Sequence, residues 1–288
     1  MSLATFKNIL KKFENEKHID LNLFWGEPLL NQEIIDYVIW NDFCFTQNIE
    51  KISINTNGIL LNKKIRDFAL KNKEKVIIDL SLDGNREIHD YYRKDIWGKG
   101  TYDKIIQNIF SIEDFSNYNI NFCVSPFASD KLFISIENLY NLGFRKIKLI
   151  FLYEKYWSYD NIHKLCWEFL KLKSFPRELN LNIFHPYISR ENECKNDFLE
   201  SFTFLPSGEL IPCPVWISKN ASAVPDISPF YIKEIKEKEK IIQEKVFWNP
   251  QLSSIITSWA ICESIQWENF LRNKKIIEAL LSKIYKYE

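Results

Sequence analysis

The sequence has no closely spaced cysteines, no net charge and no long apolar run. Its six cysteines are scattered over 288 residues, which is not the pattern of a disulfide framework. Lys and Arg total 38 and so do Asp and Glu, so the balance suggests no nucleic-acid partner and no membrane-surface partner. No apolar run reaches the ~18 residues of a membrane span, and no signal-peptide pattern opens the chain. We therefore expect a cytoplasmic protein that does not cross a membrane.

Glycine is also scarce, and its placement is informative. Three of the seven glycines, Gly26, Gly58 and Gly84, come just after a predicted strand. A chain poor in glycine uses it where the backbone needs a positive φ or a close approach to a ligand. The carboxyl ends of parallel strands are where α/β proteins bind small molecules. Tight turns between strands and helices would explain the same glycines without any ligand.

Short β-rich runs alternate with amphipathic helical stretches through the first two-thirds of the chain. The predicted strands are Ile19–Trp25, Lys51–Thr56, Val76–Leu82, Ile120–Ser125, Lys146–Leu152 and Leu179–Phe184. The predicted helices are Asn31–Phe45, Asn62–Lys71, Tyr102–Ile112, Lys131–Leu142 and Asn161–Leu172. Continuous apolar strands alternating with such helices predict an α/β fold with a parallel sheet that curls with its helices outside.

The pattern changes after Phe184. Residues 202–205 and 209–213 read as a β-hairpin around Pro206-Ser207-Gly208. A helix over 232–244 and a helical tail from about residue 253 follow. We therefore predict two domains, a barrel-like domain over 4–185 and a smaller C-terminal region over 186–288.

Four strand-end motifs occur in one order over residues 20–105. They are Trp25-Gly26-Glu27-Pro28, Thr56-Asn57-Gly58, Ser81-Leu82-Asp83-Gly84 with Ile88-His89-Asp90 and Arg93, and Lys99-Gly100-Thr101-Tyr102-Asp103. In this order and spacing the chain resembles the radical SAM superfamily, in its SPASM branch of peptide and protein maturases similar to the anaerobic sulfatase-maturating enzymes. The resemblance implies an incomplete parallel (β/α) barrel of about six strands with a smaller SPASM-like region behind it.

The resemblance also implies a site for S-adenosylmethionine (SAM). Gly26 and Glu27 would bind the methionine amino group, Ser81 and Arg93 its carboxylate, and Thr56 and Asn57 would lie beside the ribose, with Asp83 at the same edge. The apolar strand Ile147–Ile150 would flank the adenine. Each residue has a plainer alternative: Arg93 as a surface ion-pair partner, Ser81 as a turn hydroxyl. Trp25 departs from the family, because an indole replaces its first glycine and could fill the space that SAM needs.

The family's C-terminal cysteine pattern is only partly present. Cys194, Gly208 and Cys213 reproduce the opening of the SPASM pattern, and of the remaining cysteines only Cys262 falls in the region of the rest. An iron–sulfur cluster generally takes four thiolates. We expect a vestigial metal site at Cys194, Cys213 and Cys262, and the alternative is three unrelated buried thiols.

The family uses SAM together with a [4Fe-4S] cluster held by Cys-x(3)-Cys-x(2)-Cys, and the chain has no such triplet. Its smallest gap between cysteines is 19 residues, from Cys194 to Cys213. We therefore expect no cofactor in this chain and weak SAM binding at most, with the retained residues mainly stabilising strand ends. Either an N-terminal segment was lost, or the protein is a cluster-free relative.

The sequence leaves three functional hypotheses open. The protein, or a longer parent, is a SAM-dependent radical enzyme acting on a peptide or protein. Alternatively, it is a non-catalytic scaffold that binds a peptide or a partner enzyme. A third reading, which ranks last, is a conventional barrel enzyme whose acid–base residues come from Glu27, Asp83, His89 and Asp90, although their spacing does not mark a catalytic set.

Overall fold

The structure is a computed structural model that describes residues 1–16, 18–24, 26–40, 49–152, 155–172, 174–176, 178–184, 203–204 and 210–211. The chain divides into two compact units, one of Met1–Glu16 with Pro186–Trp267 and one of Lys17–His185 with Glu268–Glu288. This division places residues 1–16 with residues 186–267, and residues 268–288 with residues 17–185. The predicted domains over 4–185 and 186–288 therefore stay a prediction. Trp25, the cysteines Cys194, Cys213 and Cys262, and the helices predicted after residue 231 lie outside the described residues.

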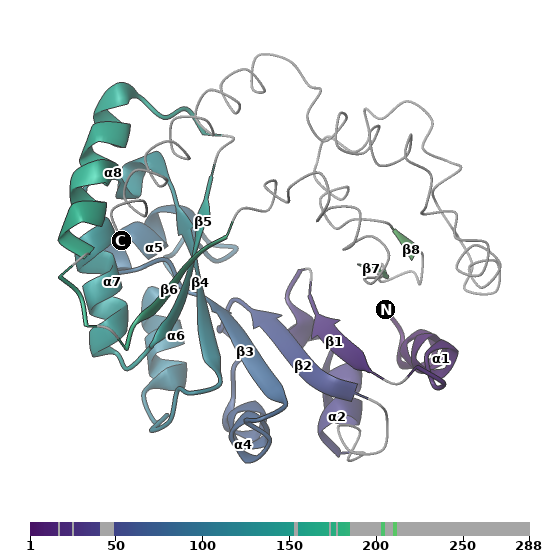
Figure 1. The fold of residues 1–288 in the computed structure, drawn as a ribbon. Helices are drawn as coiled ribbons and strands as arrows, with labels where there is room; N and C mark the ends of the chain where they lie inside the picture. Colours follow the sequence, from purple (N-terminus) through teal and green to yellow (C-terminus); the bar gives the residue numbers. More distant parts are fainter. Residues whose placement is uncertain are drawn as a thin grey trace, which may run out of the picture. The chain divides into compact units, whose positions relative to one another are not determined.

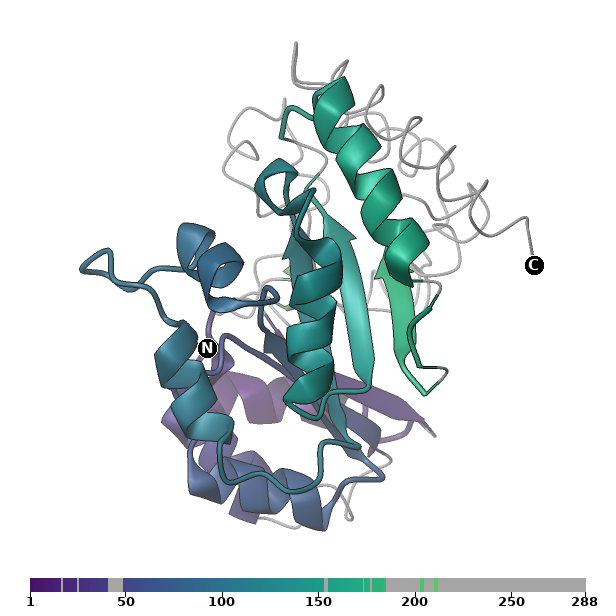
Figure 2. The same ribbon diagram turned by 90° about the vertical axis from the view of Figure 1, so that its left-hand side faces the viewer.

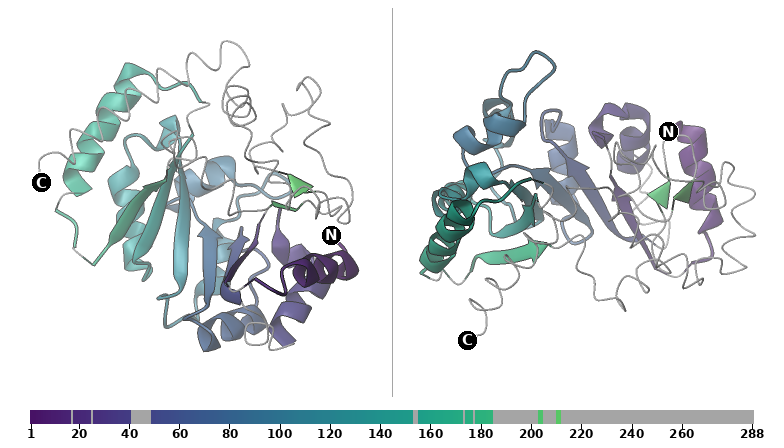
Figure 3. Two further views of the ribbon diagram at one scale, coloured as in Figure 1. Left: turned by 45° about the vertical axis from the view of Figure 1, so that its right-hand side comes forward. Right: turned by 90° about the horizontal axis from the view of Figure 1, so that it is seen from above.

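One six-stranded parallel sheet forms the framework of the second unit (Figure 1). Its strands are β1 (Ile19–Leu23), β2 (Ile49–Thr56), β3 (Val76–Ser81), β4 (Tyr118–Val124), β5 (Lys146–Phe151) and β6 (Asn180–Phe184). Every strand pairs in parallel with the next one along the chain. The prediction of six parallel strands is confirmed, and each strand lies within two residues of its predicted bounds. The sheet is open and curved, so the predicted incomplete (β/α) barrel is confirmed as well (Figures 1 and 3).

Helices cover the outer face of this sheet. They are α2 (Gln32–Trp40), α4 (Lys63–Lys71), α5 (Arg86–Tyr92), α6 (Tyr102–Ile109), α7 (Leu132–Asn141) and α8 (Tyr159–Leu172), with the short 3₁₀ turns η1 (Pro28–Leu30) and η2 (Pro126–Ala128). On the middle strands of the sheet, alternate residues such as Ile52 and Ile54 on β2 and Ile120 and Phe122 on β4 are fully buried. Apolar helix residues such as Ile105 are equally buried, so the core of this unit lies between sheet and helices.

The other strand positions are more polar than the predicted continuous apolar strands. On β4 the residues Asn119, Asn121 and Cys123 alternate with buried apolar neighbours. Asn121 donates to the side-chain oxygen of Asn55 on β2 at 3.4 Å, and Asn55 donates to Asn22 on β1 at 2.7 Å. Because β3 lies between β2 and β4, the Asn121–Asn55 bond passes over an intervening strand. The inner face of the sheet is therefore lined by hydrogen-bonded amides, whereas only the outer face is a hydrophobic core.

Among its described residues, the first unit contains one helix and one pair of antiparallel strands. Helix α1 (Leu3–Lys12) begins at Ser2, whose hydroxyl accepts a hydrogen bond from the Thr5 amide at 3.1 Å. Strands β7 (Thr203–Phe204) and β8 (Leu210–Ile211) pair antiparallel. The predicted hairpin strands are thus confirmed, while the Pro206-Ser207-Gly208 turn lies outside the described residues. Across the described parts of the chain, no helix is both long enough and apolar enough to span a membrane.

Candidate functional site

Glu27 joins the ends of the first two strands. Its Oε1 accepts hydrogen bonds from the Thr56 hydroxyl at 2.7 Å and from the Leu29 amide at 3.1 Å. Its Oε2 accepts from the Asn57 amide at 2.7 Å. Gly26 precedes it with a φ of 66°, a conformation that favours glycine. Both carboxylate oxygens of Glu27 are therefore bound by donors of the chain itself.

Thr56 and Asn57 are committed to the same turn. The buried Thr56 hydroxyl also accepts from the Gly58 amide at 3.0 Å, and the Asn57 side chain accepts from the Ile59 amide at 2.9 Å. Gly58 has a φ of 79°, and a Cβ there would lie 2.6 Å from a methyl group of Leu80. This glycine is thus required by the turn and by the packing beneath it.

A second group of side chains lies at the ends of β3 and β4. Arg93 donates to both carboxylate oxygens of Asp83, from Nε to Oδ2 and from Nη2 to Oδ1, the latter at 3.1 Å. Asp83 Oδ1 also accepts from the Cys123 amide at 2.8 Å, and Nη2 of Arg93 lies 3.5 Å from the Cys123 sulfur. The Asp83 side chain is 3% exposed and that of Arg93 is 27% exposed. Burial opposes the charge of the guanidinium, but Asp83 outweighs it and holds the Arg93 pKa above its ordinary value.

His89 is hydrogen-bonded to the backbone of this ion pair and is completely buried. Its Nδ1 accepts from the Asp83 amide at 3.2 Å, so the proton of the neutral ring belongs on Nε2. That nitrogen donates to the Thr101 hydroxyl at 3.0 Å, which in turn donates to the Arg93 carbonyl at 3.2 Å. Burial lowers the pKa of His89 to about 4; Asp83 opposes this effect and Arg93 adds to it. His89 is therefore a neutral structural link in this network.

The remaining residues of the acid–base hypothesis are also structural. Asp90 accepts a hydrogen bond from the Tyr102 amide at 2.9 Å, and a Cβ on Gly100 would collide with its carboxylate. Ser81 is half-buried at the end of β3, in register with Asn121 of β4. Within the described residues, the hydroxyl of Ser81 has no hydrogen-bond partner.

The structure therefore sorts the predicted site residues into two clusters at one sheet edge. Glu27, Thr56 and Asn57 bind one another, and Asp83 and Arg93 bind one another. Sequence reasoning missed Cys123, which joins the second cluster from β4. The signal for it was its position, because it follows Asn119 and Asn121 on the polar side of the strand.

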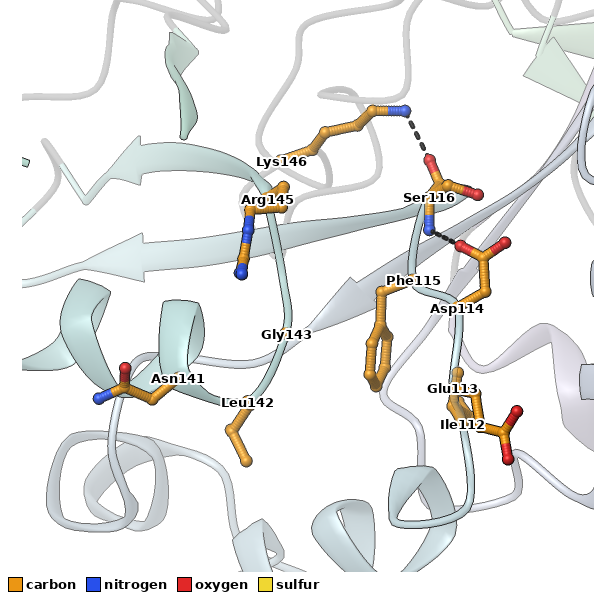
Figure 4. A pocket seen from close by; sticks show the side chains of 10 residues that line it. All are labelled: Ile112, Glu113, Asp114, Phe115, Ser116, Asn141, Leu142, Gly143, Arg145 and Lys146. Atoms are coloured by element: carbon orange, nitrogen blue, oxygen red, sulfur yellow. Dashed lines mark hydrogen bonds between the residues drawn. The ribbon is translucent and has the colours of Figure 1, made fainter. Parts of the chain in front are cut away.

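The described structure has a pocket at the opposite edge of the sheet, in the loops that lead into β4 and β5 (Figure 4). Its polar groups are held by the chain: Asp114 accepts from the Ser116 amide at 2.8 Å, and Lys146 donates to the Ser116 carbonyl at 2.7 Å. The hydrogen bond from Ser116, with further help from Lys73, lowers the Asp114 pKa to about 2. The pocket contains none of the predicted site residues, and we assign it no ligand.

Among the described residues, no three His, Cys, Asp or Glu side chains gather closely enough to hold a metal ion.

Two glycines at positive φ provide a matched test of how tightly this edge is packed. Gly84 and Gly98 have φ values of 65° and 79°. A Cβ on Gly84 would collide with the Ser135 side chain, whereas a Cβ on Gly98 would meet nothing within 4 Å.

Both alanine variants carry backbone strain of about 1–2 kcal/mol. We expect Gly84→Ala to lower the unfolding free energy by about 1–3 kcal/mol more than Gly98→Ala, because only the former overpacks the core. Urea denaturation of both variants measures the difference, and equal losses would contradict the packing described.

Comparison with known proteins identifies sequence relatives for part of the chain. No family model matches. The cysteine-type anaerobic sulfatase-maturating enzyme of Clostridium novyi (strain NT) is 34% identical over 129 residues, which are 42% of this chain and 33% of that enzyme. The GTP 3',8-cyclase of Clostridium perfringens (strain SM101 / Type A) is 30% identical over 109 residues, 38% of this chain and 32% of that enzyme. The chain thus spans about a third of the length of these curated relatives.

Solved structures have a similar fold. Native anSMEcpe with bound AdoMet has a TM-score of 0.67 at 17% sequence identity, covering 100% of this chain and 89% of that one. Native anSMEcpe with bound AdoMet and Cp18Cys peptide has a TM-score of 0.66 at 15% identity, covering 100% and 92%. The sequence matches thus relate part of the chain to the anaerobic sulfatase-maturating enzymes, whose radical SAM family its strand-end motifs resemble, and the solved structures show that the fold is shared.

Proposed function

We propose that this chain is a peptide- or protein-binding relative of the radical SAM maturases and that, by itself, it does not perform radical chemistry. The sequence contains no Cys-x(3)-Cys-x(2)-Cys segment, so it lacks the thiolates that hold the family's catalytic cluster. The residues present therefore do not fit that cluster, and we derive no reaction step through it.

The fit to SAM is also poor, and this observation carries the proposal. The resemblance assigns Arg93 to the methionine carboxylate, yet both Asp83 oxygens accept hydrogen bonds from Arg93. A second carboxylate would be left with the Arg93 donors that Asp83 does not take, and it would lie near the negative charge of Asp83. Glu27 is likewise bound by Thr56, Leu29 and Asn57. We infer that the motif residues stabilise the strand ends and have a structural rather than a ligand-binding role.

Peptide binding is supported by the inner face of the sheet. Amides of Asn22, Asn55 and Asn121 form a chain of hydrogen bonds there, and the buried Oδ1 of Asn121 has no partner among the described residues. Asparagine side chains match the donors and acceptors of a peptide backbone. Fold neighbours include native anSMEcpe with bound peptides.

The second candidate is a radical enzyme of which this sequence is a part. It is favoured by the sequence matches, which cover about a third of each relative compared above. An in-frame Cys-x(3)-Cys-x(2)-Cys in the DNA upstream of the first codon would support it directly.

SAM binding tests the first part of the proposal. Loss of the cluster iron removes a bidentate contact, and each 1.4 kcal/mol lost weakens binding about tenfold. We expect isothermal titration to give a dissociation constant for SAM of roughly millimolar or weaker. A micromolar constant that Arg93→Lys weakens would return the chain to the SAM-using proteins.

An iron count tests the second part. After anaerobic reconstitution with iron and sulfide, we expect no [4Fe-4S] cluster bound at the barrel edge. Cys194→Ser and Cys213→Ser separate the two predicted sites, because iron that these variants lose belongs to the C-terminal cysteines. About four irons per chain that both variants retain would contradict the proposal.

A further inference from the structure

A short hairpin after α5 presents two large apolar side chains to solvent. It starts and ends at Lys94 and Gly100, which form an antiparallel bridge. At its tip Ile96 is 88% exposed and Trp97 is 83% exposed. Figures 2 and 3 show the chain projecting from the unit after α5. Single exposed apolar residues are common, but two adjacent ones at a projecting tip are a recognised feature of interaction sites.

The tip is ordered by its own hydrogen bonds. Asp95 Oδ1 accepts from the amides of Trp97 and Lys99, each at 2.9 Å. The Asp95 amide donates to the Lys99 carbonyl at 2.8 Å, and the Gly98 amide donates to the Asp95 carbonyl at 3.0 Å. Ile96 and Trp97 are thus held on a preformed turn, so a ligand that binds them does not have to order the loop.

The base of the hairpin is fixed to the carboxyl edge of the sheet. The Thr101 hydroxyl donates to the Arg93 carbonyl, and the Tyr102 amide donates to Asp90. Arg93 is the residue that pairs with Asp83 at the end of β3. The hairpin is therefore rigidly attached beside the candidate site.

The charge at the tip indicates what it binds. Lys94 and Lys99 are exposed on the two arms of the hairpin, whereas the Asp95 carboxylate is turned inward to the turn amides. The tip therefore presents two apolar side chains flanked by two positive charges. A complementary ligand has carboxylates next to aromatic or aliphatic side chains.

We propose that the 94–100 hairpin is a docking element for an acidic, apolar segment of the peptide or protein partner. The inference rests on the proposed peptide binding and names both the surface and the class of sequence. Apolar residues of the segment pack on Ile96 and Trp97, and its carboxylates pair with Lys94 and Lys99. Tryptophan in such a position often contributes a large share of binding energy. The hairpin selects the partner and holds it beside the sheet edge.

The test begins with a phage-displayed library of random peptides selected on the full chain. We expect enriched sequences that combine Asp or Glu with aromatic or aliphatic residues. A synthetic peptide of that sequence is then titrated by fluorescence anisotropy against three variants. Ile96→Ser/Trp97→Ser should weaken binding about tenfold or more. Lys94→Glu/Lys99→Glu should weaken it severalfold, and more at low salt than at high salt.

Phe110→Ser is the matched control, because Phe110 is 87% exposed at the end of α6 and lies outside the hairpin. It should leave the affinity unchanged, and all three variants should retain the wild-type melting temperature. Enriched peptides that bind the hairpin variants as tightly as wild type would overturn the docking proposal and leave the proposed function standing. If no peptide enriches, both fail. Vesicles that contain phosphatidylserine test the other kind of partner. If the hairpin variants lose binding to these vesicles but still bind the peptide, the hairpin belongs to a lipid surface and the proposal is overturned too.

Discussion

Asp83→Asn should lower the free energy of unfolding by about 3 kcal/mol. The substitution keeps the shape of the side chain but leaves the Arg93 guanidinium without its counter-charge, and such losses in buried pairs cost about 3–5 kcal/mol. The lower end applies because the Arg93 side chain is still 27% exposed. Denaturant titration monitored by circular dichroism measures the change.

An exposed pair of the same residue types provides the control. Arg86 pairs with Asp103, and their side chains are 62% and 64% exposed. Asp103→Asn should cost at most about 1 kcal/mol, because solvent screens that pair. The double variant Asp83→Leu/Arg93→Met should recover much of the loss of Asp83→Asn, since it removes both charges together. Equal losses for the two Asp→Asn variants would show that burial does not matter at this pair.

The stability of the protein should fall in mild acid because of His89. Its pKa is about 4 in the folded protein, whereas an unfolded histidine has its ordinary value of 6.5. Between these pH values the unfolded chain binds a proton that the folded chain does not, so stability is full above pH 6.5 and is lost as the pH falls towards 4. The slope is about 1.4 kcal/mol per pH unit, and the total is about 3 kcal/mol.

His89→Gln isolates this contribution from the carboxylates that titrate over the same range. The variant should be less stable than wild type at neutral pH, because it disturbs the bonds to the Asp83 amide and to Thr101. The difference between the two proteins should shrink by about 3 kcal/mol between pH 7 and pH 4. A difference that does not change with pH would mean that the imidazole has the same pKa in the folded and the unfolded protein.

The strands could be predicted because each one carries β-branched or aromatic residues between recognisable turns. Two helices could not. Helix α5 has seven residues, too few for a clear period, although Asn85 marks its start by accepting a hydrogen bond from the Ile88 amide. Helix α1 precedes the first strand and so lies outside the strand–helix alternation on which the prediction rests, although the Ser2 cap marks its start.

The site was predicted as a set of residues but not as a set of contacts. The motifs predicted that Glu27, Thr56 and Asn57 lie at one edge of the sheet. Their spacing could not predict that the Glu27 carboxylate accepts hydrogen bonds from residues at the end of the next strand. Arg93 was assigned to a ligand because guanidinium suits a carboxylate, and the structure supplies that carboxylate from Asp83. The amides of the inner face were missed because polar residues in a strand do not reveal which of them meet across a curved sheet.

The strand order has a consequence for how the protein is made. Each strand from β2 to β6 pairs with the strand synthesised just before it. Successive strands emerge from the ribosome roughly thirty residues apart, so at typical rates of synthesis each unit has about 2–6 s to dock before the next appears. From β2 to β6, each strand can pair with a strand that has already been synthesised. The sheet can therefore grow in the direction of translation from its N-terminal edge.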